Sequence, residues 1–191
     1  MKKLLLFLMP MVAASLPASA ATILFDLVGK AGSGLISGNQ NGSILGTPGS
    51  GGEVGAGIFY DDVANVLTIN VAWGLTNGFT NLTGTATLGH IHGPTIASGT
   101  ASFTQDASVL FDLDNTAAWN PSATAGGITN RTITLSASQE TELLAGRYYI
   151  NVHTGTNGAG EIRGNLVVVP EPSAGLLGLA GGALALRRRR R

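Results

Sequence analysis

Short apolar stretches separated by turn-forming residues run along most of this chain. Within them, apolar and polar side chains alternate with a period of two, which is typical of β-strands that bury one face. The stretches cover residues 22–28, 57–60, 66–73, 83–92, 108–113, 131–135, 148–153 and 162–168. Glycine, asparagine, serine and proline lie between them. Because no long stretch follows the helical period of 3.6, the pattern predicts an all-β protein, folded as an antiparallel sandwich or barrel.

Two parts of the chain depart from this alternation. Residues 138–144 favour a single helical turn, which Ser138 and the polar residues after it cap and which Gly146 ends. Residues 29–56 are rich in glycine and serine. They predict a long loop or a loosely paired ribbon.

The first twenty residues have the pattern of a secretory signal peptide. Lys2 and Lys3 precede an apolar core at residues 4–12, and Ala18-Ser19-Ala20 supplies the small residues of a cleavage site. We therefore expect a signal-peptide helix over residues 1–20, which signal peptidase removes during export.

The last residues combine a short motif, an apolar segment and a basic cluster. The motif is Val169, Pro170, Glu171 and Pro172; residues 173–186 carry no charge, and residues 187–191 are all arginine. At about 1.5 Å per residue, the apolar run spans roughly 21 Å of a hydrocarbon core about 30 Å thick. We expect a short transmembrane helix that the arginines halt and that is inserted transiently. A permanent C-terminal anchor is the alternative interpretation.

Residues 21–169 remain as one domain once both ends are set aside. They hold four basic and ten acidic side chains, a net charge of −6. This charge favours solubility and argues against binding to nucleic acid or to anionic lipid. The chain has no cysteine, which excludes disulfides, thiolate metal sites and cysteine nucleophiles.

All three histidines of the chain lie in two short predicted strands. Residues two apart on a strand share a face, so His90 and His92 project together while Ile91 points into the core. His153 lies on the polar face of the second strand, and we expect all three imidazoles on the outside. If the strands are neighbours, the imidazoles form a site for copper or zinc with one coordination position left open. The alternative is that they only hydrogen-bond to backbone and loop groups.

An Asn-Gly turn signal follows the second histidine segment and predicts a hairpin. With the turn centred near Asn157, His153 lies opposite Glu161 and Asn151 lies opposite Arg163 on the polar face. Glu161 either orients an imidazole or forms an exposed ion pair with Arg163, worth less than about 1 kcal/mol.

Other polar and aromatic groups give weaker indications. Asp112-Leu113-Asp114-Asn115 and Asp61-Asp62 offer oxygen ligands of the kind that calcium prefers, or are simply solvated strand ends. Trp73 and Trp119 either stack on sugars or anchor the core. The chain has no Gly-x-Ser-x-Gly elbow, no phosphate-binding loop and no catalytic carboxylate pair. We therefore expect no enzymatic activity.

The C-terminal order of motif, apolar segment and arginine cluster resembles the PEP-CTERM sorting signal of Gram-negative bacteria that make exopolysaccharide. The resemblance implies recognition by an exosortase, cleavage near the Pro-Glu-Pro motif, and delivery from the inner membrane to the cell surface or extracellular matrix. Exopolysaccharide and other matrix components are the partners that this destination implies.

A second resemblance rests on His-Ile-His-Gly at 90–93, Tyr-Tyr-Ile-Asn-Val-His-Thr at 148–154 and Gly-Glu-Ile-Arg-Gly at 160–164. These segments resemble the CHRD domain, and the likeness extends over roughly residues 22–168. It implies a β-sandwich and no particular reaction. We expect an immunoglobulin-like or superoxide-dismutase-like Greek key.

These features divide the chain into a signal peptide (1–20), a β-sandwich domain (21–169) and a sorting signal (170–191). They favour an exported surface or matrix module with a structural, adhesive or binding role. The alternative is a surface protein that binds copper or zinc through His90, His92 and His153.

Overall fold

Twelve β-strands form the framework of the structure, a computed structural model that describes residues 22–170. Every pairing between these strands is antiparallel. The predicted all-β antiparallel fold is therefore confirmed. The strands are β1 (Thr22–Gly29), β2 (Gly32–Ser33), β3 (Leu35–Ile36), β4 (Ser50–Glu53), β5 (Ile58–Asp61), β6 (Val66–Trp73), β7 (Ala86–His92), β8 (Val109–Asp112), β9 (Trp119–Asn120), β10 (Gly127–Thr134), β11 (Tyr149–Thr154) and β12 (Ile162–Val168). The other elements are α1 (Ala137–Leu144) and the 3-10 helices η1 (Ser37–Asn39), η2 (Leu75–Asn77) and η3 (Gly99–Thr104).

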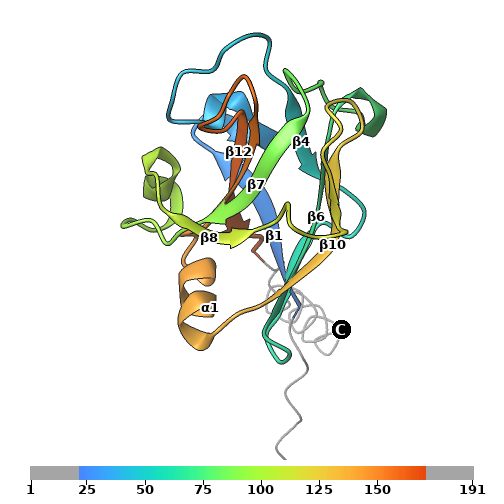
Figure 1. Cartoon of the computed structure of the whole chain (residues 1–191). Coiled ribbons are helices and arrows are strands. Elements are labelled where there is room, and N and C mark those ends of the chain that lie inside the picture. Colours follow the sequence, from blue (N-terminus) through green and yellow to red (C-terminus); the bar gives the residue numbers. More distant parts are fainter. Residues whose placement is uncertain (1–21, 171–191) are drawn as a thin grey trace, which may run out of the picture.

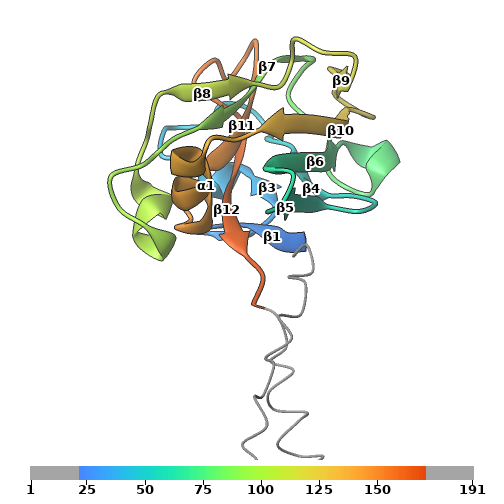
Figure 2. The same ribbon diagram turned by 90° about the horizontal axis from the view of Figure 1, so that it is seen from below.

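Strand β1 joins two layers of one folded sheet, because it pairs with β5 in one layer and with β12 in the other. The first layer continues from β5 through β6 and β10 to β9, and the second from β12 through β11 and β7 to β8. The short strands β3 and β4 join the layers again, through β12 and β6. Figure 1 shows the resulting sandwich, with β7 and β8 on one side and β6 and β10 on the other. Figure 2 shows α1 and β9 at opposite ends of it.

The core between the layers is apolar. Its fully buried side chains include Leu27, Ile91, Ile128 and Trp73, and each contributes about 1.5–3 kcal/mol by leaving water. The ring centroids of Trp73 and Trp119 lie 5.2 Å apart, and the Trp73 indole N–H donates to the Ser122 carbonyl at 2.8 Å. Trp73 therefore anchors the core, and the sugar-stacking interpretation is wrong for this residue.

Residues 29–56 form more regular structure than a loop. They contain β2, β3, η1 and β4, and the prediction of a loosely paired ribbon holds for these short strands. A Cβ atom at Gly51 would lie 2.4 Å from the carbonyl oxygen of Ala72. Glycine at this position lets β4 approach β6 closely, so the glycine-rich composition here reflects packing as well as turns.

The predicted helical turn is longer than expected and begins earlier. Helix α1 spans Ala137–Leu144, and its N-cap is Ser136, two residues before the predicted one. The Ser136 hydroxyl accepts from the Gln139 amide at 3.3 Å, and the Gln139 side chain accepts from the Ser136 amide at 2.9 Å. This is a capping box. Gly146, at φ 68°, follows the helix as predicted.

The two ends of the described chain lie together. The Val169 amide, just after β12, donates to the Leu24 carbonyl of β1 at 2.9 Å. The predicted signal peptide at 1–20, and Glu171, Pro172 and the apolar and arginine segments of the tail, lie outside the described residues. Between residues 22 and 170, no helix is long and apolar enough to cross a membrane.

Candidate metal centre

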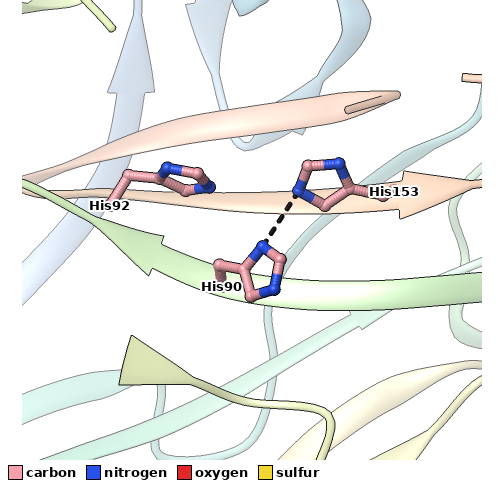
Figure 3. Close-up of side chains that lie close together, drawn as sticks. All are labelled: His90, His92 and His153. Carbon is pink, nitrogen blue, oxygen red and sulfur yellow. Dashed lines mark hydrogen bonds between the residues drawn. The ribbon is translucent and has the colours of Figure 1, made fainter. Parts of the chain in front are cut away.

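The pairing of β7 with β11 brings the three histidines together. His90 lies opposite Asn151, and His153 lies opposite Leu88, so all three imidazoles occupy one face of this strand pair. Ile91 points to the other side and is fully buried, as predicted. One ligand atom from each of His90, His92 and His153 lies within 4.8 Å of the others. Figure 3 shows the rings grouped over the two strands.

Two of the ring nitrogens are in direct contact. The Nδ1 atom of His90 lies 3.1 Å from the Nε2 atom of His153. The centroid of the His92 ring lies 5.4 Å from that of His90 and 6.1 Å from that of His153. After small side-chain rotations, ring nitrogens at such distances are compatible with bonds of about 2.0–2.1 Å to one zinc or copper ion.

The outer nitrogens of two rings are held by backbone carbonyls. His92 Nδ1 lies 2.9 Å from the Ala107 carbonyl oxygen, and His153 Nδ1 lies 3.0 Å from that of Gly158. A carbonyl can only accept, so both Nδ1 atoms carry the proton and both Nε2 atoms carry a lone pair. This is the arrangement that orients a histidine for metal binding. The Nε2 atom of His92 is buried and has no hydrogen-bond partner among the described residues.

Burial lowers the pKa of His92 and of His153. In each ring the hydrogen bond to the carbonyl opposes this effect, and the neighbouring His90 ring adds to it. Both rings are therefore neutral at neutral pH. Neutral imidazole is the form that binds metal ions.

The expectation that the imidazoles lie on the outside is wrong. His90 is 8% exposed and His153 is 7% exposed, while His92 is half-buried. The polar face of this layer is covered by the turn at Gly158, which holds His153, and by the segment after η3, which holds His92 at Ala107. The three rings thus lie between these loop segments and the strands.

The hairpin after β11 has the predicted register, with Asn151 opposite Arg163. The prediction of an exposed ion pair between Glu161 and Arg163 is wrong, because both residues are fully buried and bind other groups. The Glu161 carboxylate accepts from the Gly49 amide at 2.8 Å, from the Thr83 amide and hydroxyl, and from the Thr154 hydroxyl at 2.7 Å. Glu161 therefore binds the loops that contain Gly49 and Thr83 and does not orient an imidazole.

A stack of three side chains supports His92. The Tyr149 ring is parallel to the His92 ring, with an interplanar angle of 2° and centroids 4.9 Å apart. The Arg163 guanidinium carbon lies 3.5 Å from the Tyr149 centroid, and its Nη1 lies 3.0 Å from Asp106 Oδ1. Tyr149 and Asp106 were absent from the sequence prediction. The alternation that puts Asn151 and His153 on the polar face also puts Tyr149 there, and this is the signal from which its position can be inferred.

Asp112 and Asp114 also lie beside this cluster. Strand β8 pairs Asp112 directly with His90, and the Asp112 Oδ1 atom lies 3.7 Å from His90 Nε2. One ligand atom from each of His90, Asp112 and Asp114 lies within 4.8 Å of the others. At the other acidic segment, Asp61 Oδ1 accepts from the amides of Val63 and Ala64, which is a turn contact.

Comparison with known families gives one match. The model of the CHRD domain matches residues 35–166, more than half of the chain, and the match includes both histidine segments. No curated protein and no solved structure matches the chain.

Proposed function

The chain belongs to the CHRD domain family, whose members are typically extracellular or periplasmic, and on this premise we propose that it is an exported module that binds copper or zinc. His90, His92 and His153 are the proposed ligands. The role that we propose is binding and not catalysis.

The observation that carries the proposal is the arrangement of the imidazole nitrogens. The Nε2 atoms of His92 and His153 bear lone pairs because both Nδ1 atoms donate to carbonyls. Without a metal, the Nδ1–H group of His90 donates a hydrogen bond to His153 Nε2 at 3.1 Å. With a metal, His90 places its proton on Nε2, which faces Asp112 Oδ1 at 3.7 Å. Nδ1 of His90 and the Nε2 atoms of His92 and His153 can then bind one ion.

The energetics favour an ion in this place. The buried Nε2 of His92 has no hydrogen-bond partner within residues 22–170, which costs the folded state about 1–3 kcal/mol; a bond to a metal would remove this cost. The domain has a net charge of −6, so its field attracts cations. Imidazole nitrogen is a common ligand for zinc and copper, and three such ligands leave one position for water or another donor.

Metal titration of the chain, purified without a histidine tag, tests the proposal. We expect copper or zinc to bind tightly and to raise the melting temperature, because the ion binds the folded state. His92→Asn keeps an amide N–H toward Ala107 but removes the Nε2 ligand. Loss of a group that only orients a metal ligand costs about 10–100-fold in affinity, so loss of the ligand itself should cost more than about 100-fold.

Glu142→Gln serves as the control, because Glu142 lies on α1 and binds Arg147. It should leave metal affinity unchanged. Wild-type protein that binds neither metal, or a His92→Asn variant that binds as tightly as the wild type, would contradict the proposal.

For delivery, we propose that an exosortase cleaves near Pro170 and releases or attaches the domain at the cell surface or in the matrix. The support is the order of the tail and the position of its first residues, which leave the domain directly after β12. In Figure 2, the end of β12 lies at the bottom and β7 and β8 lie at the top. In a domain attached through this end, β7, which carries His90 and His92, would lie on the side away from the attachment point. Intact-mass measurement of exported protein should show the loss of residues 187–191; their retention would exclude processing.

A further inference from the structure

We propose a second cation site, formed by His90 Nε2, Asp112 and Asp114, so that the His90 imidazole bridges two metal ions. The inference rests on the proposed function, because the first ion occupies the Nδ1 side of the same ring. The second ion belongs to the class that a nitrogen and two carboxylate oxygens select, a divalent cation such as Zn²⁺ or Mn²⁺.

The two nitrogens of His90 face different groups. Nδ1 lies 3.1 Å from His153 Nε2, whereas Nε2 lies 3.7 Å from Asp112 Oδ1. The latter distance is too long for a hydrogen bond. The residue is 8% exposed and its side chain is 10% exposed, and Nε2 is directed at a carboxylate.

The sheet holds the two carboxylates beside this nitrogen. Asp112 lies directly opposite His90 in the pairing of β7 with β8. Leu113, between them, is fully buried, whereas Asp112 is exposed and Asp114 is half-buried. Ligand atoms of His90, Asp112 and Asp114 lie within 4.8 Å of one another, which small side-chain rotations reduce to the separations found around one ion.

The carboxylate oxygens have few competing partners. Across residues 22–170, neither carboxylate accepts a hydrogen bond, and Arg131 donates to the backbone carbonyl of Asp112 at 3.2 Å instead of to its side chain. The Asp112 side chain is 53% exposed, so the second ion is accessible from solvent and completes its shell with water. Calcium fits less well, because it takes six to eight oxygen ligands and no imidazole.

Binding of the second ion has a defined proton balance. With the first ion on Nδ1, the Nε2 atom of His90 carries a proton. The second ion forms a bond to Nε2, the N–H bond breaks, and one proton passes to solvent. The two carboxylates neutralise the dication, which offsets the electrostatic cost of placing it beside the first ion.

The test compares metal stoichiometry in the full chain and two double variants. Protein loaded with Cu²⁺ is titrated with Zn²⁺, and both metals are measured after gel filtration. We expect one copper and one zinc per wild-type chain. Asp112→Asn with Asp114→Asn should lose the zinc and keep the copper. Asp26→Asn with Glu140→Gln removes two carboxylates elsewhere and should keep both metals.

A spectroscopic readout identifies the bridge. With Cu²⁺ in both sites, the shared imidazolate couples the two spins, so the paramagnetic signal per copper should fall in the wild type and be restored in the Asp112→Asn, Asp114→Asn variant. One ion per wild-type chain, or two ions that the variant also binds, would overturn the second site and leave the three-histidine site in place. Failure of the wild type to bind any copper or zinc would overturn both.

Discussion

Glu161 is a buried carboxylate whose removal we expect to destabilise the domain strongly. It is fully buried and accepts hydrogen bonds from two backbone amides and from the hydroxyls of Thr83 and Thr154. The Asn157 side chain adds a longer contact at 3.3 Å. Burial by itself raises the pKa of Glu161, but the hydrogen bonds from Thr83, Gly49 and Thr154 together lower it below the ordinary value of 4.5.

The size of the expected loss in unfolding free energy depends on which hydrogen bonds of Glu161 a glutamine can still form. In Glu161→Gln, the amide oxygen still accepts from Gly49 and Thr83, and the hydroxyl of Thr154 can rotate to accept from the new NH₂ group. Asn157 cannot adapt, because its NH₂ group then faces another donor. Hydrogen bonds to charged groups contribute about 1.5–3 kcal/mol, against about 0.5–1.5 for neutral ones. Over four such bonds with partial compensation, we expect the unfolding free energy to fall by about 2–4 kcal/mol.

Urea unfolding of the wild type and Glu161→Gln at several pH values tests this reasoning. The folded pKa lies below the unfolded one, so the contribution of Glu161 is fully present above pH 4.5 and is lost as the pH falls through the folded pKa. The difference in unfolding free energy should be constant from pH 7 to about 5 and shrink below 4.5. Glu142→Gln, which breaks a partly exposed pair with Arg147, should cost less than about 1 kcal/mol. A Glu161→Gln cost below 1 kcal/mol at pH 7, or one that does not change with pH, would refute the argument.

Two further substitutions probe packing and the stack. Gly51→Ala places a methyl group 2.4 Å from the backbone oxygen of Ala72. We therefore expect the free energy of unfolding, measured by thermal denaturation, to fall by about 3 kcal/mol or more. A stability equal to that of the wild type would show that β4 can move away from β6. Tyr149→Leu removes the ring that contacts the Arg163 guanidinium, whereas Tyr149→Phe keeps it. The leucine variant should therefore lose about 1–2 kcal/mol more unfolding free energy than the phenylalanine variant. Equal losses would argue against the cation–π contact.

Local periodicity predicted the framework of the site. Alternation placed His90 and His92 on one face and Ile91 in the core, and the turn signal near Asn157 placed Asn151 opposite Arg163. Both inferences involve residues close in sequence, where the pleat and a tight turn determine which side chains face each other.

Burial of the site could not be predicted in the same way. The groups that cover it come from Ala107 and Gly158, which lie in loops outside the predicted strands. A polar strand face looks the same in sequence whether water or a loop covers it. For this reason the sequence predicted that Glu161 forms an exposed ion pair. In the structure, its buried carboxylate accepts hydrogen bonds from several loops. The pairing of Asp112 with His90 likewise depends on which strand lies next to β7, a long-range choice that alternation does not encode.

The Glu161 contacts and the metal centre are coupled through the turn between β11 and β12. Thr154 follows His153 directly, and the Gly158 carbonyl that orients His153 lies in the same turn. Glu161→Gln should therefore weaken metal binding by about 10–100-fold, the usual effect of disturbing groups that orient a ligand. Leu67→Ala, in β6 of the other layer, should cost a similar 2–5 kcal/mol of stability and leave the affinity of the folded protein unchanged. If Leu67→Ala weakens binding as much as Glu161→Gln, general loosening explains the effect and the specific coupling is wrong.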